Sequence, residues 1–191
     1  MFNDLAKSND LTAATVTAGA GAKEKINGGG VFKFQCFDKD GNLKWEESTH
    51  NLVVNEGLKD MNDKYFSGVT YSAAWYIGLV TGPGAGNTYA AGNTLASHIG
   101  WTEDTNYSGN RKAVTFGAAT LADPSVISNS ASPSSFSITG TTTVAGAFLA
   151  SVATGSSGIL FSVSNFQSPG DRSVVNGDTL NVTYTFSLDA A

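Results

Sequence analysis

The segment Thr179-Leu180-Asn181-Val182-Thr183-Tyr184-Thr185-Phe186-Ser187-Leu188 decides the fold class, because polar and apolar side chains alternate along it without interruption. Successive side chains of a β-strand point to opposite faces of the sheet, so this period of two predicts a long strand with one buried and one solvated face. The preceding Asn176-Gly177-Asp178 is typical of a turn.

A second alternating segment begins near residue 31 and predicts a β-hairpin. Phe32, Phe34 and Cys36 alternate with polar side chains, and the alternation resumes over residues 43–46. Between the two strands, Asp38-Lys39-Asp40-Gly41 provides turn residues in an exposed acidic loop. We expect Cys36 to be a small buried apolar side chain rather than a reactive thiol.

Five further segments have the length and pattern of short strands. They are residues 74–80, 111–116, 135–139, 144–150 and 158–163. The first is apolar at nearly every position, which predicts a strand buried on both faces. Several short strands separated by turn residues favour a mainly β protein, built as an antiparallel β-sandwich or a jelly-roll-like barrel. Periodicity leaves these two alternatives open, because it carries no information on strand order.

One short helix is predicted, over about residues 55–66. The apolar side chains that recur there at helical spacing are Leu58, Met61, Tyr65 and Phe66. Asn55 is a suitable N-cap, and Glu56 suits the positive end of the helix dipole. We expect the apolar stripe of this helix to cover an open end or edge of the sheet.

The chain is expected to divide into an arm and a domain. Residues 1–30 carry few large apolar side chains and end in three glycines, so they cannot offset their own ordering entropy. We predict a flexible N-terminal arm over residues 1–30, and a single β-sandwich domain over residues 31–191. The arm is either a disordered tail or a segment that orders against a neighbouring subunit. Residues 81–110 form a long connection, which is typical of functional or mobile loops.

The composition excludes several classes of function. Only 14% of the 191 residues are charged and the net charge is −5, so we expect no nucleic-acid partner. One cysteine and two histidines exclude an intramolecular disulfide framework and a Cys- or His-rich metal centre, and we expect no cofactor and no metal. No apolar run is long enough to span a bilayer, and no leader precedes the domain, which predicts a protein made in a cytoplasm without a membrane partner.

Catalytic motifs are incomplete, and we predict that the protein is not an enzyme. The segments nearest to a nucleophile elbow, Ser108-Gly109 and Gly155-Ser156-Ser157-Gly158, lack its spacing. His50 and His98 are the only candidate bases, and neither has the sequence context of a catalytic triad.

Two loops resemble ligand-binding motifs without completing them. The glycine-rich residues 82–86 lack the Lys and the Ser or Thr that end a phosphate-binding loop. Residues 38–42 begin like a calcium loop, whose terminal glutamate would fall on Thr49. A hairpin turn is therefore the preferred interpretation of residues 38–42, with an adventitious cation site as the alternative.

Six residues are candidates for contact with a partner, because we expect them to be exposed. They are Lys23 and Lys25 in the arm, Asp38 and Asp40 at the hairpin tip, and Trp101 and Tyr107 in the long loop. Trp45, Trp75 and Trp101 could form a sugar-stacking platform, but burial in the core or an interface is the preferred interpretation for all three. Of the three, only Trp101 lies in a segment that we expect at the surface.

Several segments together carry a resemblance to a known family. They are residues 51–58 (NLVVNEGL), 75–79 (WYIGL), 111–116 (RKAVTF), 143–149 (TVAGAFL) and 177–184 (GDTLNVTY). As a set they resemble a class of small virion structural proteins of tailed bacteriophages, over roughly residues 31–189. The resemblance implies a non-enzymatic component of the particle and leaves its position on the head or the tail open.

We favour a capsid decoration (cement) protein, because the chain is small, acidic, armed and expected to be a single domain. Its expected partners on the capsid surface are the major capsid protein and further copies of itself, arranged as a trimer. A tail component or receptor-binding fibre is the alternative, suggested by the Gly/Thr/Ser-rich composition and by Trp101. A carbohydrate-binding or hydrolytic domain is the third hypothesis.

Overall fold

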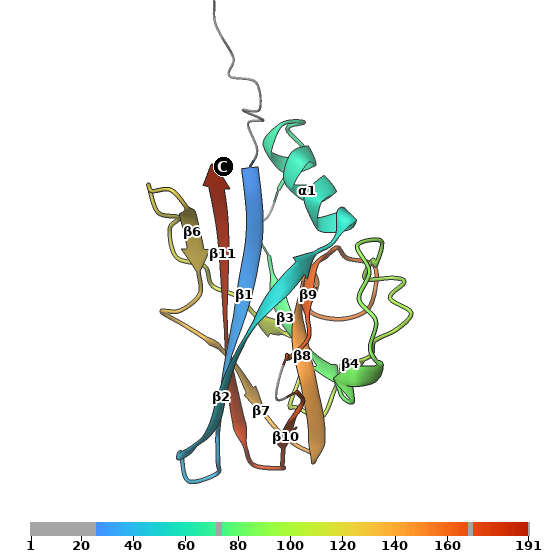
Figure 1. Cartoon of the computed structure of the whole chain (residues 1–191), viewed down its shortest axis with the longest axis vertical. Helices are drawn as coiled ribbons and strands as arrows, with labels where there is room; N and C mark the ends of the chain where they lie inside the picture. Colours follow the sequence, from blue (N-terminus) through green and yellow to red (C-terminus); the bar gives the residue numbers. More distant parts are fainter. Residues whose placement is uncertain (1–25, 72–73, 168–169, 191) are drawn as a thin grey trace, which may run out of the picture.

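The computed structural model describes residues 26–71, 74–167 and 170–190. Over these residues the chain is mainly β, with eleven strands and one α-helix (Figure 1). The strands are β1 (Ile26–Phe37), β2 (Leu43–Val53), β3 (Tyr76–Thr81), β4 (Glu103–Asp104), β5 (Lys112–Ala113), β6 (Ser125–Ser128), β7 (Ser134–Ser137), β8 (Thr142–Ala150), β9 (Leu160–Ser164), β10 (Arg172–Val174) and β11 (Thr179–Ala190). Helix α1 (Asn55–Tyr65) follows β2, and a 3₁₀ turn, η1 (Gly84–Gly86), follows β3.

The strands pair in antiparallel fashion and form one curled sheet, a half-barrel, so the predicted mainly β, antiparallel class is confirmed. The hydrogen-bonded order is β4-β3-β8-β9-β2-β1-β11-β6, with β5 beside β3, β10 beside β8 and β7 beside β11. The longest pairing joins β1 to β11, from Ile26 opposite Ala190 to Phe37 opposite Thr179. Residues 51–53 of β2 pair with β9 and join the two halves of the sheet.

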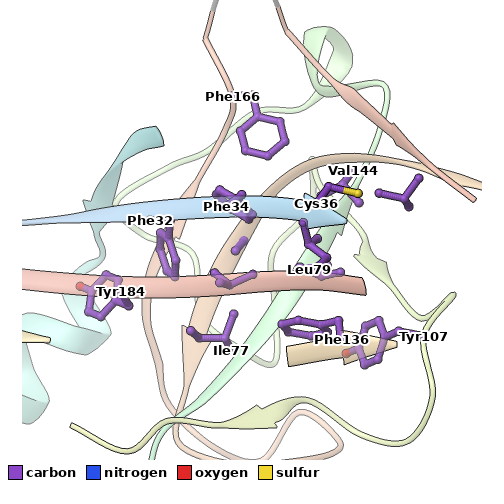
Figure 2. Packing of buried hydrophobic residues seen from close by; sticks show 14 of the residues in the cluster. Phe32, Phe34, Cys36, Ile77, Leu79, Tyr107, Phe136, Val144, Phe166 and Tyr184 are labelled. Atoms are coloured by element: carbon purple, nitrogen blue, oxygen red, sulfur yellow. The ribbon is translucent and has the colours of Figure 1, made fainter. Parts of the chain in front are cut away.

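The core lies between the β1–β11 half and the β3–β8 half of this sheet (Figure 2). Phe32, Phe34 and Cys36 of β1 are fully buried, as their alternation predicts. Tyr184 of β11 packs beside Phe32, with ring centroids 4.6 Å apart. Ile77 of β3 belongs to the same cluster. Alternation along β1 and β11 therefore determines which face is apolar, and the curl of the sheet supplies the opposing face.

The other face of β3, β8 and β9 is also buried. Val80, Phe148 and Val163 pack there with Leu95 and Trp101, which lie in the connection between β3 and β4. That connection therefore acts as a cover for the sheet. The prediction of a strand buried on both faces is confirmed for β3.

Some boundaries differ from the predictions. Residues 26–30, expected in the flexible arm, form the first part of β1 and pair with residues 186–190 of β11, so the predicted end of the arm at residue 30 is wrong. Gly30 makes this pairing possible, because a Cβ there would lie 2.6 Å from the Tyr184 hydroxyl oxygen.

The predicted strand over residues 111–116 is reduced to β5. Strands β4, β6 and β10 have two to four residues each, too few to show a period in the sequence.

Helix α1 confirms the predicted helix, although its cap differs. Val54 occupies the cap position and makes no side-chain hydrogen bond, so the prediction of Asn55 as N-cap is wrong. The Glu56 carboxylate instead accepts hydrogen bonds from the backbone amides of Leu160 (2.7 Å) and Leu95 (3.2 Å). A single side chain in the first turn of α1 thus holds both β9 and the covering connection.

Candidate interaction surface

An apolar cleft lies beside α1. Helix α1 lies at the end of the molecule where β1 begins and β11 ends (Figure 1). We call this cleft the α1 cleft. It has a volume of about 380 Å³. Its lining residues are Asp60, Met61, Lys64, Tyr71, Trp75, Phe116, Ile127, Leu149, Phe161, Tyr184 and Phe186. All except Asp60 and Lys64 are apolar or aromatic, so the cleft suits an apolar side chain better than a polar ligand.

Exposed apolar side chains gather around the same end of the molecule. Tyr65 and Phe66, at the C-terminal end of α1, are 83% and 78% exposed, and their rings meet edge to face at 4.8 Å. With three half-exposed neighbours they form what we call the α1 rim: Leu58, Tyr65, Phe66, Val69 and Tyr71. Single exposed apolar residues are normal, but adjacent exposed aromatic rings such as those of Tyr65 and Phe66 are typical of a contact surface.

The α1 rim corrects the expectation that the whole apolar stripe of the helix covers the sheet. Only Met61 of the four stripe residues packs against the core. Leu58, Tyr65 and Phe66 are exposed instead. Helical spacing predicted the helix, but it did not predict which of its apolar residues are buried.

The two charged groups at the cleft compensate each other. Asp60 is buried, and its Oδ1 lies 3.8 Å from Nζ of Lys64. The Lys64 ammonium also lies 5.7 Å from the centre of the Tyr71 ring. Because the charges are paired, the cleft offers no net charge to an incoming ligand.

The floor of the cleft is a structural network rather than a reactive site. The Tyr184 hydroxyl accepts a hydrogen bond from Nδ2 of Asn51 (2.9 Å), and Oδ1 of Asn51 accepts one from the Gly30 amide (2.7 Å). Burial raises the pKa of Tyr184 above its ordinary value, with the hydrogen bond from Asn51 acting in the opposite direction. Tyr184 is therefore held neutral, and it links β11 to β1 and β2.

The hairpin tip satisfies its own polar groups. Oδ1 of Asp38 accepts hydrogen bonds from the amides of Asp40 (2.9 Å) and Asn42 (2.8 Å), and Gly41 has a φ of +84°. These bonds, led by the one from the Asn42 side chain, lower the pKa of Asp38. The predicted hairpin turn is confirmed. Asp40 pairs with its neighbour Lys39, with Oδ2 2.8 Å from Nζ.

A buried polar cluster closes the core at this same end of the molecule. Oδ2 of Asp178 accepts hydrogen bonds from Nζ of Lys44 (2.5 Å), from the Val175 amide (2.9 Å) and from the Cys36 thiol (3.8 Å). Burial, followed by the nearby Asp178 carboxylate, raises the pKa of Cys36 to about 12. The expectation that Cys36 is a buried side chain is confirmed.

The expectation that Trp101 and Tyr107 are exposed is wrong, because they are only 5% and 6% exposed. Trp101 packs on Phe148 at 5.1 Å and stacks on His98 at 3.9 Å, while its indole N–H donates to Oδ1 of Asn93. Tyr107 meets the Phe136 ring edge to face at 4.8 Å. Both residues fix the loop to the sheet and are not available to a partner. Lys23 and Lys25 lie outside the described residues.

The three tryptophans are integrated separately into the packing. Trp45 packs on Phe166 and Trp75 on Phe161, each in an edge-to-face contact. Both are partly buried against the core, whereas Trp101 belongs to the cluster on the opposite face of the sheet. Burial, the preferred interpretation, is confirmed for Trp101 and holds in part for the other two. They do not form a common sugar-stacking platform.

The described residues contain no assembled catalytic group. His50 is an exposed side chain on β2, and Nδ1 of His98 lies 3.2 Å from the carbonyl oxygen of Trp101. Neither ring has a hydrogen bond to a hydroxyl or carboxylate in this part of the chain. No group of three side chains suited to a metal ion occurs between residues 26 and 190, the gaps at 72–73 and 168–169 aside.

Comparisons with protein-family models, curated proteins and solved structures find no match for this chain. None of the helices in the described ranges is long and apolar enough to cross a membrane. The α1 cleft and its rim are the apolar candidate surface of the described chain. The sequence gives little sign of the cleft, because its walls come from α1, β6, β8, β9 and β11 and from residues 71, 75 and 116.

Proposed function

We propose that this chain is a non-enzymatic structural protein of a bacteriophage particle: a decoration protein that binds the outer surface of the capsid and stabilises the head. The observation that carries the proposal is the α1 rim, which places two aromatic side chains almost fully in solvent at one end of the half-barrel. Aromatic residues of this kind supply much of the binding energy when they become buried in an interface. The resemblance to virion structural proteins supplies the identity of the partner.

The other surfaces fit this role. The hairpin tip is polar and internally hydrogen-bonded, as suits a region that faces solvent on an assembled particle. The partners in this proposal are the major capsid protein and further copies of the chain, in a trimer on the capsid surface after synthesis in the host cytoplasm. Repetition over a lattice makes a modest interface sufficient, because many weak contacts act together.

Binding of the full chain to phage heads assembled without it tests this proposal. We expect wild-type protein to bind such heads, and the double substitution Tyr65→Ser, Phe66→Ser to weaken binding by roughly tenfold or more. Ile99→Ser is the matched control, because Ile99 is 91% exposed in the connection between β3 and β4 and is not one of the residues of the α1 rim. Equal binding by wild type and the double variant, or wild-type protein on tails only, contradicts the proposal.

The alternative functions lose part of their motivation. The tail-fibre hypothesis and the carbohydrate hypothesis both relied on Trp101 as an exposed contact, and Trp101 is buried. The Gly/Thr/Ser-rich composition remains, but it is equally suited to a decoration protein. Density for the chain on the tail would favour the fibre hypothesis, and specific binding on a glycan array would favour the carbohydrate hypothesis.

A further inference from the structure

The α1 cleft is apolar and lies close to the start of the described chain. None of the described residues fills it. Phe186 and Tyr184, on its floor, are the partners of Gly30 and Phe32 in the pairing of β1 with β11. Leaving such a surface in water is unfavourable by about 25 cal/mol per Å² of apolar area. An apolar segment tethered nearby is therefore a natural occupant.

We propose that the α1 cleft is the docking site for the N-terminal segment of the same chain, with Leu11 as the side chain that enters it. The 25 residues that precede β1 are MFNDLAKSNDLTAATVTAGAGAKEK. Their large apolar side chains are few, and Leu11 and Val16 flank a stretch of small Thr and Ala residues. One Leu side chain among small neighbours suits a cleft of about 380 Å³. This inference does not depend on the proposed capsid function.

The reach of the chain selects Leu11. β1 begins with Ile26 opposite Ala190, the last described residue of β11, so a preceding segment that docks in the cleft has to reverse direction. The sequence offers glycines for this reversal at positions 19 and 21. At roughly 3.3 Å per residue, residues 21–25 extend about 16 Å outwards, and the returning chain is level with Ile26 again near residue 15. About four residues further, at the level of Phe186, the chain arrives at Leu11.

Tethering favours the same chain over a second copy. A short linker holds its ligand at an effective concentration in the millimolar range, above that of free copies in a dilute solution. The paired charges of Asp60 and Lys64 leave the cleft without a net charge, so they neither repel nor select the charged residues that flank the docked stretch.

Disulfide mapping in the full-length chain tests the docking. Thr12→Cys combined with Lys64→Cys places one thiol beside Leu11 and one at the cleft. Native Cys36 does not interfere, because it is buried and its pKa of about 12 keeps it protonated. The control pair is Thr12→Cys with Asp40→Cys, since Asp40 lies at the hairpin tip, at the far end of the molecule (Figure 1).

We expect an intramolecular disulfide to form in the 12/64 pair at least about tenfold faster than in the 12/40 pair. Adding Leu11→Asp to the 12/64 pair should reduce its rate to that of the control, because a carboxylate is excluded from an apolar cleft. Equal rates in the two pairs, or no effect of Leu11→Asp, would overturn the proposal. Disulfide-linked dimers as the main product would overturn the assignment to the same chain and place the segment of a second copy in the cleft.

Discussion

The two ends of the half-barrel are closed in different ways. At the hairpin end, Asp38 and Asp178 collect backbone and side-chain donors, and the polar groups are paired within the chain. At the α1 end, the closing helix leaves a cleft beside it and exposes Tyr65 and Phe66. The hairpin end pairs its polar groups within the chain, and the open cleft of about 370 Å³ there is lined by Phe37, polar residues and glycines, whereas the α1 end carries apolar surface that a partner or another segment can bury. The hairpin end therefore holds residues that maintain the fold, and the α1 end holds residues available for binding.

The largest expected effect on stability is at the hairpin end. Asp178→Ala removes the partner of Lys44 and leaves the Val175 amide without its acceptor, so we expect a loss of about 3 kcal/mol in the free energy of unfolding. Urea denaturation measures this value. Asp40→Ala, at the exposed tip, should change it by less than about 0.5 kcal/mol. Similar losses for the two variants would show that the buried cluster does not close this end.

The second effect concerns the way α1 is attached. A Cβ at position 57 would lie 2.4 Å from the carbonyl oxygen of Phe161, so Gly57→Ala must push the helix away from β9. We expect a loss of about 2 kcal/mol in the free energy of unfolding. Gly86→Ala is the control, because a Cβ at Gly86 meets nothing within 4 Å. A stable Gly57→Ala variant would mean that α1 is attached more loosely than its close contact with β9 indicates.

A smaller effect is expected at the floor of the cleft. Tyr184→Phe leaves Nδ2 of Asn51 without its acceptor in a buried region, which should cost about 1 kcal/mol. Tyr71→Phe removes a hydroxyl that also accepts a hydrogen bond, from the indole of Trp75, but at an exposed position. Its cost, measured in the same urea titration, should be near zero. A larger loss for Tyr71→Phe than for Tyr184→Phe would reverse the assignment of floor and rim.

The smallest effect on stability is expected at the α1 rim. Because Tyr65 and Phe66 are mostly in solvent, the double substitution with serine should change the free energy of unfolding by less than about 0.5 kcal/mol. The same variant should bind less of a hydrophobic dye, which fluorescence titration measures. A large loss of stability would show that these rings support the fold and would remove the distinction between the two ends.

Sequence periodicity predicted the strands in which buried and exposed side chains alternate. Alternation in β1 and β11 identifies Phe32, Phe34 and Tyr184 as core residues. It could not predict that residues 26–30 pair with β11, because glycines carry no apolar signal and the pairing depends on a partner more than 150 residues away.

Less of the candidate interaction surface could be predicted from the sequence. Position in a long loop suggested an exposed Trp101, but the loop folds back over the outer face of β3 and β8 and buries the indole. Exposure depends on which face of the sheet lacks a cover, and this follows from tertiary packing. Consecutive aromatic residues at the end of the helix were the one local signal of the α1 rim.

A cryo-electron microscopy reconstruction of phage particles that contain the chain tests whether it binds the outer capsid surface through α1. We expect density for this chain on the outer capsid shell, with α1 and the exposed rings of Tyr65 and Phe66 buried against a capsid or neighbouring subunit and the hairpin tip at residues 38–42 facing solvent. A particle in which the hairpin tip makes the contact and α1 points outward, or in which the chain is absent from the shell, would contradict this expectation.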